Sequence, residues 1–211
     1  MAELVAGVVH VVDDNCAVCD SLRLLLNACG FDVRTYTDAA AFLTAIPPGP
    51  ACLLTDINMP AMDGLELQHH LQAGHTDLSI IVMTGDADVD KAVRAMKSGA
   101  IDFLQKPFDE TTLISAVSNA LAASAHRVAA RQSAQVAAAR LARLTKREAE
   151  VFALLVAGHP TKAIASSLAA SPRTIEVHRA RVMEKLAVTS LADLVRLSLT
   201  ASGQPGDPGR D

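Results

Sequence analysis

Four places in the chain carry carboxylate, hydroxyl or ammonium side chains directly after a short apolar run. An apolar run of four to eight residues closed by turn residues is typical of a buried strand. In parallel sheets, ligands bind at the edge where the carboxyl ends of the strands meet. We therefore expect four separate segments to bring their side chains to one edge: Asp13-Asp14, Asp56, Thr84-Gly85 and Lys106-Pro107.

The chemistry open to this set is metal binding and phosphoryl transfer. Three carboxylates, from Asp13, Asp14 and Asp56, repel one another at one edge and favour a hard divalent cation such as Mg²⁺. A carboxylate beside Mg²⁺ can attack a phosphoryl group and carry an acyl phosphate. Lys106 and Thr84 then offer an ammonium group and a hydroxyl to the phosphate oxygens. The alternative, an ordinary loop aspartate at position 56, leaves the other edge positions unexplained.

The first half of the chain alternates between strand-like and helix-like segments. This alternation predicts an α/β fold, in which a doubly wound, five-stranded parallel sheet is covered by helices on both faces. The predicted strands are 7–12, 31–36, 51–56, 78–85 and 101–108, and the predicted helices are 17–30, 38–46, 64–74, 88–100 and 109–124. Residues 121–140 are rich in Ala and contain no Gly or Pro, so a helical linker is expected next.

The second half is predicted to be a small, all-α domain of four helices. A short helix, a tight turn and a longer basic helix are typical of a helix-turn-helix. The longer helix is expected over 172–186, with Ile175, Val182 and Leu186 on its core side. Capping residues predict the four helix starts: Thr145 with Glu148 as a capping box, Thr161, Ser171 before Pro172, and Ser190.

Charge is distributed unevenly between the two halves. Residues 1–120 contain 6 Lys and Arg against 16 Asp and Glu, a net charge of −10, whereas residues 141–200 contain 9 against 5, a net charge of +4. This asymmetry predicts two domains with different partners, the basic one binding nucleic acid. No apolar run reaches the roughly 18 residues that span a bilayer, and the N-terminus lacks the basic start of a secretory signal. We therefore expect a cytoplasmic protein with no membrane partner.

Three further motifs have less specific interpretations. Cys16 and Cys19 form a Cys-x-x-Cys motif, but a second pair of zinc ligands is missing, so we favour small, buried or half-buried residues on one helix face. Residues 86–90 begin like a calcium loop but lack its Gly and final Glu, which favours an acidic helix N-terminus. His69-His70 are predicted to be solvated surface residues.

The edge residues resemble those of the receiver domain of two-component response regulators, with Asp56 inside "DINMPAMDG". Residues 144–186 resemble the LuxR-type helix-turn-helix. Together they resemble a NarL/FixJ-type transcriptional regulator, closest to the FixJ branch, over about residues 7–200. The resemblance implies four parts: a flavodoxin-like receiver domain at 1–122, a helical linker at 123–140, a LuxR-type DNA-binding domain at 141–200 and a disordered tail at 201–211.

The resemblance also implies roles for individual residues. Asp56 is the expected phospho-acceptor, and Phe103 is the expected aromatic switch. The implied Mg²⁺ ligands are Asp14, Asp56 and the backbone carbonyl of Asn58, with Asp13 acting through metal-bound water. Thr84 and Lys106 are expected to bind the phosphoryl oxygens. Asn15 departs from the family, because many members carry an acidic residue there.

The implied partners are a sensor histidine kinase, double-stranded promoter DNA, RNA polymerase and, on phosphorylation, a second copy of the chain. The groove-facing side of the recognition helix is expected to include Ala180. The other expected DNA contacts are Arg173, Thr174, Glu176, Val177, His178, Arg179 and Arg181, with internal packing as the alternative for His178.

Two enzyme classes are the competing functions. An aspartyl-phosphate phosphohydrolase usually carries a second Asp two residues after its nucleophile, and this chain has Asn58 there. A nucleotide-dependent dehydrogenase requires a G-x-G-x-x-G after the first strand, and this chain has Asp13-Asp14-Asn15 instead. The phosphohydrolase alternative also leaves the C-terminal domain without a purpose, so a non-enzymatic regulator is the favoured prediction.

Overall fold

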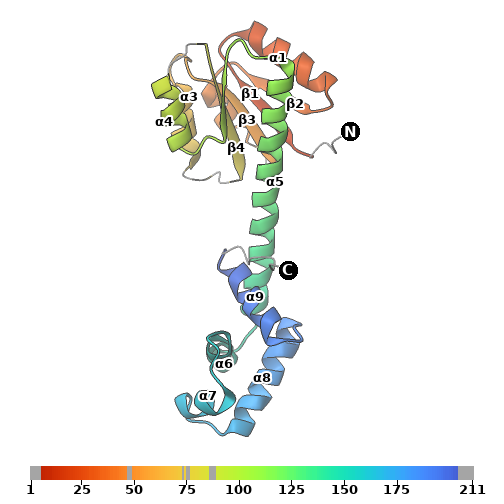
Figure 1. Ribbon diagram of the computed structural model, residues 1–211, viewed down its shortest axis with the longest axis vertical. Coiled ribbons are helices and arrows are strands. Elements are labelled where there is room, and N and C mark those ends of the chain that lie inside the picture. Colours follow the sequence, from red (N-terminus) through yellow and green to blue (C-terminus); the bar gives the residue numbers. More distant parts are fainter. Residues whose placement is uncertain (1–5, 47–48, 73, 75–76, 86–88, 204–211) are drawn as a thin grey trace. The chain divides into compact units, whose positions relative to one another are not determined.

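The computed structural model describes residues 6–46, 49–72, 74, 77–85 and 89–203 (Figure 1). The chain divides into two compact units, Met1–Val128 and Ala129–Asp211, which are described separately below. The predicted acidic helix N-terminus at 86–90 falls mainly outside the described residues, as does most of the predicted disordered tail. In the described part of the chain, no helix is both long and apolar enough to cross a membrane.

The first unit is a five-stranded parallel sheet with the strand order β2-β1-β3-β4-β5. The predicted α/β, doubly wound fold is therefore confirmed. The strands are β1 (Val8–Val12), β2 (Asp32–Tyr36), β3 (Ala51–Asp56), β4 (Leu78–Thr84) and β5 (Asp102–Gln105). The helices that alternate with them are α1 (Cys16–Ala28), α2 (Ala39–Leu43), α3 (Gly64–Gln72), α4 (Val89–Lys97) and α5 (Glu110–Leu141).

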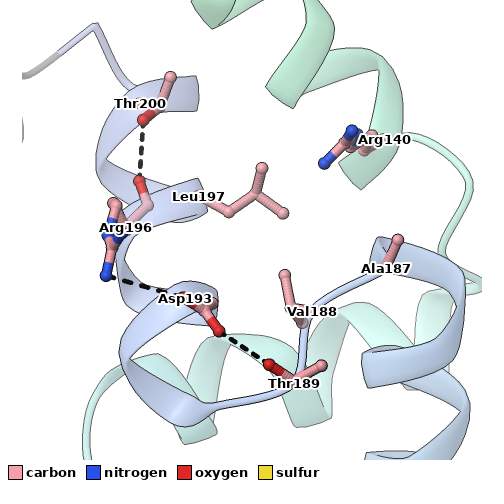
Figure 2. Close-up of a pocket in the computed structure, with 8 residues that line it drawn as sticks. All are labelled: Arg140, Ala187, Val188, Thr189, Asp193, Arg196, Leu197 and Thr200. Carbon is pink, nitrogen blue, oxygen red and sulfur yellow. Dashed lines mark hydrogen bonds and ion pairs between the residues drawn. The ribbon is translucent and has the colours of Figure 1, made fainter.

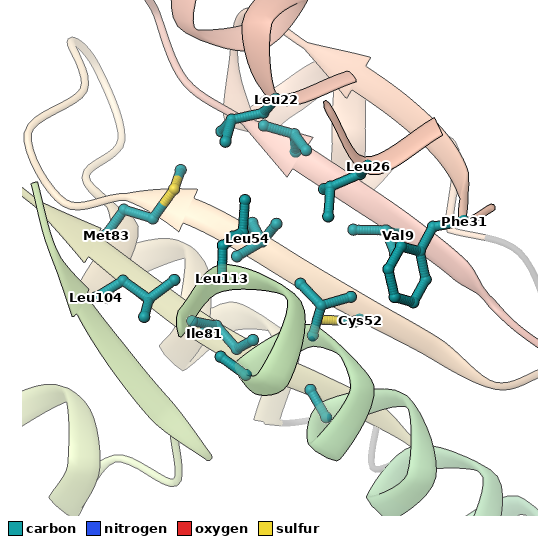
Figure 3. Close-up of a cluster of buried hydrophobic side chains, with 14 of the residues drawn as sticks. Val9, Leu22, Leu26, Phe31, Cys52, Leu54, Ile81, Met83, Leu104 and Leu113 are labelled. Atoms are coloured by element: carbon teal, nitrogen blue, oxygen red, sulfur yellow. The ribbon is translucent and has the colours of Figure 1, made fainter. Parts of the chain in front are cut away.

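Each face of the sheet packs against its own set of helices (Figure 1). On one face, Leu54 and Ile81 pack with side chains of α1 and α5, as Figure 3 shows. On the other face, Leu53 and Val82 pack with side chains of α2, α3 and α4. Neighbouring residues of one strand therefore point to opposite cores, as the twofold period of a strand requires. The central strand β3 is buried at every position, which holds its last residue, Asp56, at a defined place.

The loop after β3 turns tightly because Gly64 lies against the end of the strand. The Gly64 amide donates to the carbonyl of Ile57 at 3.0 Å, and a Cβ at Gly64 would lie only 2.2 Å from the carbonyl oxygen of Asp56. Real Cβ atoms do not approach oxygen so closely. The Asp63-Gly64 pair thus closes the loop from Asp56 and starts α3.

Helix α5 is longer than predicted, since the expected helix 109–124 and linker 123–140 form one helix from Glu110 to Leu141. The division between the units follows Val128, later than the predicted boundary at residue 122. The reason is that two polar side chains beyond residue 122 bond to the sheet. The Ser124 hydroxyl accepts from the amide of Ala51 at 2.9 Å, and the Arg127 guanidinium donates to Ser79 at 2.6 Å.

The second unit contains four short helices after the end of α5, as predicted. They are α6 (Lys146–Val156), α7 (Thr161–Ser167), α8 (Pro172–Leu186) and α9 (Leu191–Ala201). Their shared core is built from fully buried side chains, among them Val151, Ile164, Ile175, Val182, Leu186 and Leu194. The predicted core side of the longer helix, at Ile175, Val182 and Leu186, is therefore confirmed.

Three of the four predicted helix caps are confirmed, at Thr145, Ser171 and Ser190. The prediction for Thr161 is wrong, because Thr161 is already the first helical residue and Pro160 occupies the N-cap without a side-chain bond. The Pro160 carbonyl still accepts from the amides of Ala163 and Ile164. At the other end, α9 reaches Ala201, so the predicted tail begins inside a helix.

Gly64→Ala is expected to destabilise the first unit, because the added Cβ forces the end of β3 and the start of α3 apart. Such overpacking costs about 1–3 kcal/mol. We expect the melting temperature of this unit to fall by roughly 5–10 °C in calorimetry of the full chain.

The control is Gly74→Ala, since a Cβ at Gly74 meets no atom within 4 Å. Equal melting temperatures for the two variants would show that the loop at Gly64 adapts and that the close approach is unimportant.

The second unit contains a buried carboxylate that ties α6 to α8. Glu148 is 3% exposed, and its Oε2 accepts from Lys185 Nζ at 2.7 Å and from the Thr145 amide at 2.8 Å. The Lys185 bond, and next the Thr145 amide, lower the pKa of Glu148 to about 2, against the opposing effect of burial.

We expect the second unit to lose stability as the pH falls from about 4.5 to 2. The carboxylate has a lower pKa in the folded than in the unfolded chain, so its stabilising effect is complete above pH 4.5 and disappears as the folded form protonates. Glu148→Gln should make the melting temperature of this unit less dependent on pH in that window. Part of the dependence remains, because the bond from the Ser190 hydroxyl also lowers the pKa of Asp193.

Glu150→Gln is the matched control on the same helix, because Glu150 pairs with Arg147 at the half-exposed surface. Melting by circular dichroism between pH 7 and pH 3 compares the variants. If Glu150→Gln flattens the pH profile as much as Glu148→Gln does, the buried bridge is not its cause.

Candidate functional site

A single ammonium group joins two carboxylates at the carboxyl edge of the sheet. Lys106 Nζ donates to Asp13 Oδ2 at 2.6 Å and to Asp56 Oδ1 at 2.7 Å. Asp13 directly follows β1, Asp56 ends β3, and Lys106 directly follows β5. The structure thus brings together three of the predicted edge residues from three separate segments.

Both carboxylates are nearly inaccessible to water. Asp13 is 1% and Asp56 is 7% exposed, whereas the Lys106 side chain is 24% exposed. Burial lowers the pKa of Lys106, but its hydrogen bonds and charge interactions with the two aspartates raise that pKa more, and the net shift is upward. Lys106 is therefore a permanent cation at this edge.

Backbone amides hold the second oxygen of each carboxylate. The Asn58 amide donates to Asp56 Oδ2 at 2.7 Å, and the Asn15 amide donates to Asp13 Oδ1 at 3.0 Å. In both cases the donor is two residues further along the chain, which is the geometry of an Asx-turn. Asn15 also caps α1, since its side chain accepts from the amide of Ala17. Both carboxylates therefore have defined orientations.

Asp14 differs from the other two aspartates. It is exposed and takes no part in the Lys106 bridge. Among the residues that the structure describes, no group of three or more His, Cys, Asp or Glu side chains is close enough to hold a metal ion. The expected meeting of three carboxylates thus holds for Asp13 and Asp56 alone.

The remaining predicted residues of the first unit lie on β4 and β5. Thr84 ends β4 and is 2% exposed, and its carbonyl accepts from the Lys106 amide at 2.7 Å. This bond connects the strand that carries the hydroxyl to the residue that carries the ammonium group. Phe103 lies on β5 beside Val82 of β4, with 42% of its surface exposed.

The structure adds one residue that the sequence did not indicate. Lys91 of α4 donates from its Nζ to Asn58 Oδ1 at 3.1 Å, which places a second cation beside the loop after Asp56. No spacing rule links positions 58 and 91, because the contact joins the loop after β3 to the first turn of α4. In the sequence, Lys91 looks like any charged residue of a surface helix.

Large apolar side chains are exposed on α4 and around β5. Val93 and Met96 on α4 are each 43% exposed, and Ile101 and Phe103 are 36% and 42% exposed. Exposed large apolar side chains on neighbouring elements such as α4 and β5 are typical of a protein interaction site.

In the second unit, α8 separates a buried side from an exposed one. At 100° per residue, Arg173, Val177 and Ala180 lie opposite the buried positions 175, 182 and 186. All but one of the predicted DNA-contact residues are exposed: Arg173, Thr174, Glu176, Val177, Arg179 and Arg181. The exception is His178, which is half-buried, with its Nδ1 buried and without a partner among the described residues.

Cationic side chains line a hollow near the C-terminal end of α8. A hollow of about 520 Å³ is lined by Arg143, Arg181 and Lys185, together with Glu184 and Ala187. Lys185 is paired with the buried carboxylate of Glu148, so Arg143 and Arg181 are the cations that make this hollow a suitable neighbour for phosphate groups.

A second hollow, of about 320 Å³, lies between the end of α5, the turn after α8 and α9 (Figure 2). Its polar groups largely bond to one another: Thr200 donates to the carbonyl of Arg196, and Asp193 accepts from Thr189. None of the predicted site residues lines it. We therefore assign no chemistry to this hollow.

Comparison with known protein families matches both units. The response regulator receiver domain family matches residues 9–118, and the family of bacterial regulatory proteins of the luxR type matches residues 142–198.

Relatives match nearly the whole chain. It is 46% identical to the transcriptional regulatory protein FixJ of Azorhizobium caulinodans over 200 residues, which are 94% of this chain and 95% of FixJ. It is 40% identical to the C4-dicarboxylate transport transcriptional regulatory protein DctR of Rhodobacter capsulatus, over 90% of this chain and 98% of DctR.

Solved structures agree with these matches. The response regulator StyR superimposes with a TM-score of 0.80 at 40% identity, over 91% of this chain and 98% of StyR. Full-length FixJ from B. japonicum has a TM-score of 0.57 at 43% identity, over 93% of this chain and 97% of FixJ. With both domains matched in one order over almost its whole length, the chain belongs to the FixJ-like transcriptional response regulators of two-component systems, in which a receiver domain precedes a LuxR-type DNA-binding domain.

Proposed function

We propose that Asp56 is the phospho-acceptor of this response regulator. The observation that carries this proposal is the bridge from Lys106 to Asp56 and Asp13, which orients the Asp56 carboxylate at the sheet edge. A sensor histidine kinase is the phosphoryl donor that the receiver family implies. A carboxylate oxygen of Asp56 attacks the phosphorus, a P–O bond forms, and the P–N bond to the histidine of the kinase breaks, with its electron pair leaving on the imidazole.

Lys106 and Thr84 are the proposed donors to the phosphoryl oxygens. Lys106 already contacts the acceptor, and the hydroxyl of Thr84 belongs to the strand end that the Lys106 amide binds. A dianionic phosphoryl group attracts both an ammonium group and a hydroxyl. Movement of Thr84 toward the phosphoryl group would change the packing of the exposed Phe103 on the neighbouring strand.

We further propose that the acidic edge binds Mg²⁺, as receiver domains generally do at their phosphorylation site. The proposed ligands are oxygen atoms alone: the carboxylates of Asp14 and Asp56 and the backbone carbonyl of Asn58 bind the ion directly, and Asp13 acts through metal-bound water. This donor chemistry fits a hard divalent cation, and two buried carboxylates that share one ammonium group still carry excess negative charge. When bound, Mg²⁺ supplies positive charge for the phosphoryl oxygens.

Phosphorylation is proposed to produce a homodimer through the apolar surface of α4 and β5. Val93, Met96, Ile101 and Phe103 are all more than one-third exposed, and a second copy of the same surface would cover them. In a twofold dimer the same surface of both copies forms the interface, so these four residues would contact the same surface of the second copy. Two paired DNA-binding domains then read two half-sites of a promoter.

The DNA-binding surface is proposed to be the exposed side of α8. Arg173 and Val177 on this side are suited to a guanine or phosphate and to a thymine methyl group, respectively. Arg181, next to Arg143 and Lys185, is suited to the phosphate backbone. The relatives FixJ and DctR are named as transcriptional regulatory proteins, so we assign promoter DNA, RNA polymerase and a cytoplasmic location to this chain as well.

Asp56→Asn is expected to abolish phosphate uptake and the response to beryllofluoride, a phosphoryl mimic. With Mg²⁺ present, the wild type should incorporate labelled phosphate from acetyl phosphate, and its mass in light scattering should double with beryllofluoride. In the variant both signals should be absent, because the amide is neither a nucleophile nor a ligand for the mimic.

Asp32→Asn is the control, since Asp32 is an exposed carboxylate at the start of β2, at the sheet edge opposite the site. Retained uptake in Asp56→Asn would overturn the acceptor assignment. If the wild type takes up phosphate but its mass does not double, the acceptor assignment of Asp56 stands and the proposed dimer is overturned.

Arg173→Ala is expected to weaken binding to DNA by about 1–3 kcal/mol, or about 5- to 150-fold in Kd. The probe is a duplex selected from a random library by the wild type with beryllofluoride, and Kd is measured by fluorescence anisotropy at several salt concentrations. A phosphate contact should also reduce the salt slope by about one.

Arg196→Ala removes the same charge from the exposed surface of α9 and is the control. If it weakens binding as much as Arg173→Ala does, the effect comes from net charge and not from α8.

A further inference from the structure

The Cys-x-x-Cys motif lies directly behind the proposed phosphorylation site. Cys16 is the first residue of α1, and Asn15 caps the helix two residues after Asp13. Cys16 is exposed, whereas Cys19, one turn further along, is 4% exposed. Reactive cysteine pairs commonly combine an accessible first sulfur at a helix N-terminus with a buried second one.

The two cysteines lie three residues apart at the start of α1, the spacing of a Cys-x-x-Cys redox motif. Residues three apart on a helix are neighbours on its surface, with Cβ atoms about 5–6 Å apart. A disulfide accepts Cα atoms about 4.4–6.8 Å apart but needs Cβ atoms about 3.5–4.5 Å apart, so closing the pair requires the first turn of α1 to draw the two Cβ atoms together by about 1–2 Å. The other two cysteines lack such a partner: Cys52 is buried within β3, and Cys29, beyond the other end of α1, donates to Glu110.

The buried thiol contacts the backbone of the site itself. The single S–H of Cys19 lies between two acceptors, the carbonyl of Asp13 at 3.4 Å and the carbonyl of Tyr36 at 3.5 Å. Asp13 also accepts the short bond from Lys106. The Cys19 thiol therefore supports the residue that shares Lys106 with Asp56, and a change at this sulfur acts on that residue directly.

We propose that Cys16 and Cys19 form a reversible disulfide that slows phosphorylation at Asp56. The oxidant is a small disulfide such as oxidised glutathione. The Cys16 thiolate attacks one of its sulfurs and releases one small thiol. Cys19 then attacks the Cys16 sulfur of the mixed disulfide and releases the second small thiol, so two protein thiols are oxidised and one small disulfide is reduced.

The consequence for the site follows from the lost thiol hydrogen. Once bonded to Cys16, the Cys19 sulfur no longer donates to the Asp13 carbonyl, and the first turn of α1 closes toward Cys16. Loss of a hydrogen bond that supports a metal ligand typically lowers metal affinity or activity 10–100-fold. We expect phosphate uptake to slow roughly tenfold in the oxidised protein. This consequence depends on the proposed role of Asp56, whereas disulfide formation itself does not.

The test begins with the full-length chain in glutathione redox buffers. Free thiols are counted with a chromogenic disulfide under denaturing conditions, and alkylated peptides are mapped by mass spectrometry. The expected result is the joint loss of two of the four thiols, a peptide linked between Cys16 and Cys19, and full recovery with dithiothreitol.

Cys16→Ser should abolish the joint loss, and Cys29→Ser should leave it unchanged. Glutathione that stays attached at Cys16, or thiols that remain free in oxidised glutathione, would overturn the proposal.

Phosphate uptake from acetyl phosphate is then measured for both redox states of the wild type and of Cys16→Ser. Slower uptake in the oxidised wild type alone supports the link to the site, and equal uptake in both states overturns it. Absence of uptake even in the reduced wild type, with the disulfide present after oxidation, would instead contradict the role of Asp56.

Discussion

The arrangement of the receiver domain depends on the cost of burying two carboxylates side by side. Asp13 and Asp56 end adjacent strands and are each less than 10% exposed, so without a cation they would strongly disfavour the folded state. Lys106 offsets this cost with two short bonds, but only because β5 lies in the same sheet, two strands away from β3. The strand order thus provides the charge balance, and Thr84 on β4 lies between the aspartates and the lysine along the edge.

The strands, their polar ends and most helix starts could be predicted from the sequence, because they depend on the spacing of apolar residues and on turn and capping residues. Apolar runs closed by Asp13, Asp56 and Thr84 mark strand ends, and parallel strands bring such ends to one edge. The two capping boxes and the Ser171-Pro172 start likewise depend on residues three positions apart. Local rules of this kind depend on the backbone alone, so they hold wherever the surrounding elements form as expected.

Apart from the helix cap at Thr161, which lies one residue earlier at Pro160, the failures concern contacts between residues far apart in the chain, for which no spacing rule exists. Lys91 reaches Asn58, and Ser124 reaches Ala51, across loops whose geometry a linear pattern does not contain. The Ser124 bond also explains why the first unit extends beyond residue 122. Cys16 was expected to be buried or half-buried but is exposed, because a side chain next to a buried position can still point to water.

Charge and the apolar surface together constrain how two receiver domains can meet. With a net charge of −10 over residues 1–120, two copies repel each other, and a phosphoryl group on each increases the repulsion. Half of the six basic residues in this region, Lys91, Arg94 and Lys97, lie on α4, beside Val93 and Met96. These three cations lower the acidity of α4 for a like-charged partner, and burying the exposed apolar side chains of α4 and β5 supplies a driving force that salt does not screen.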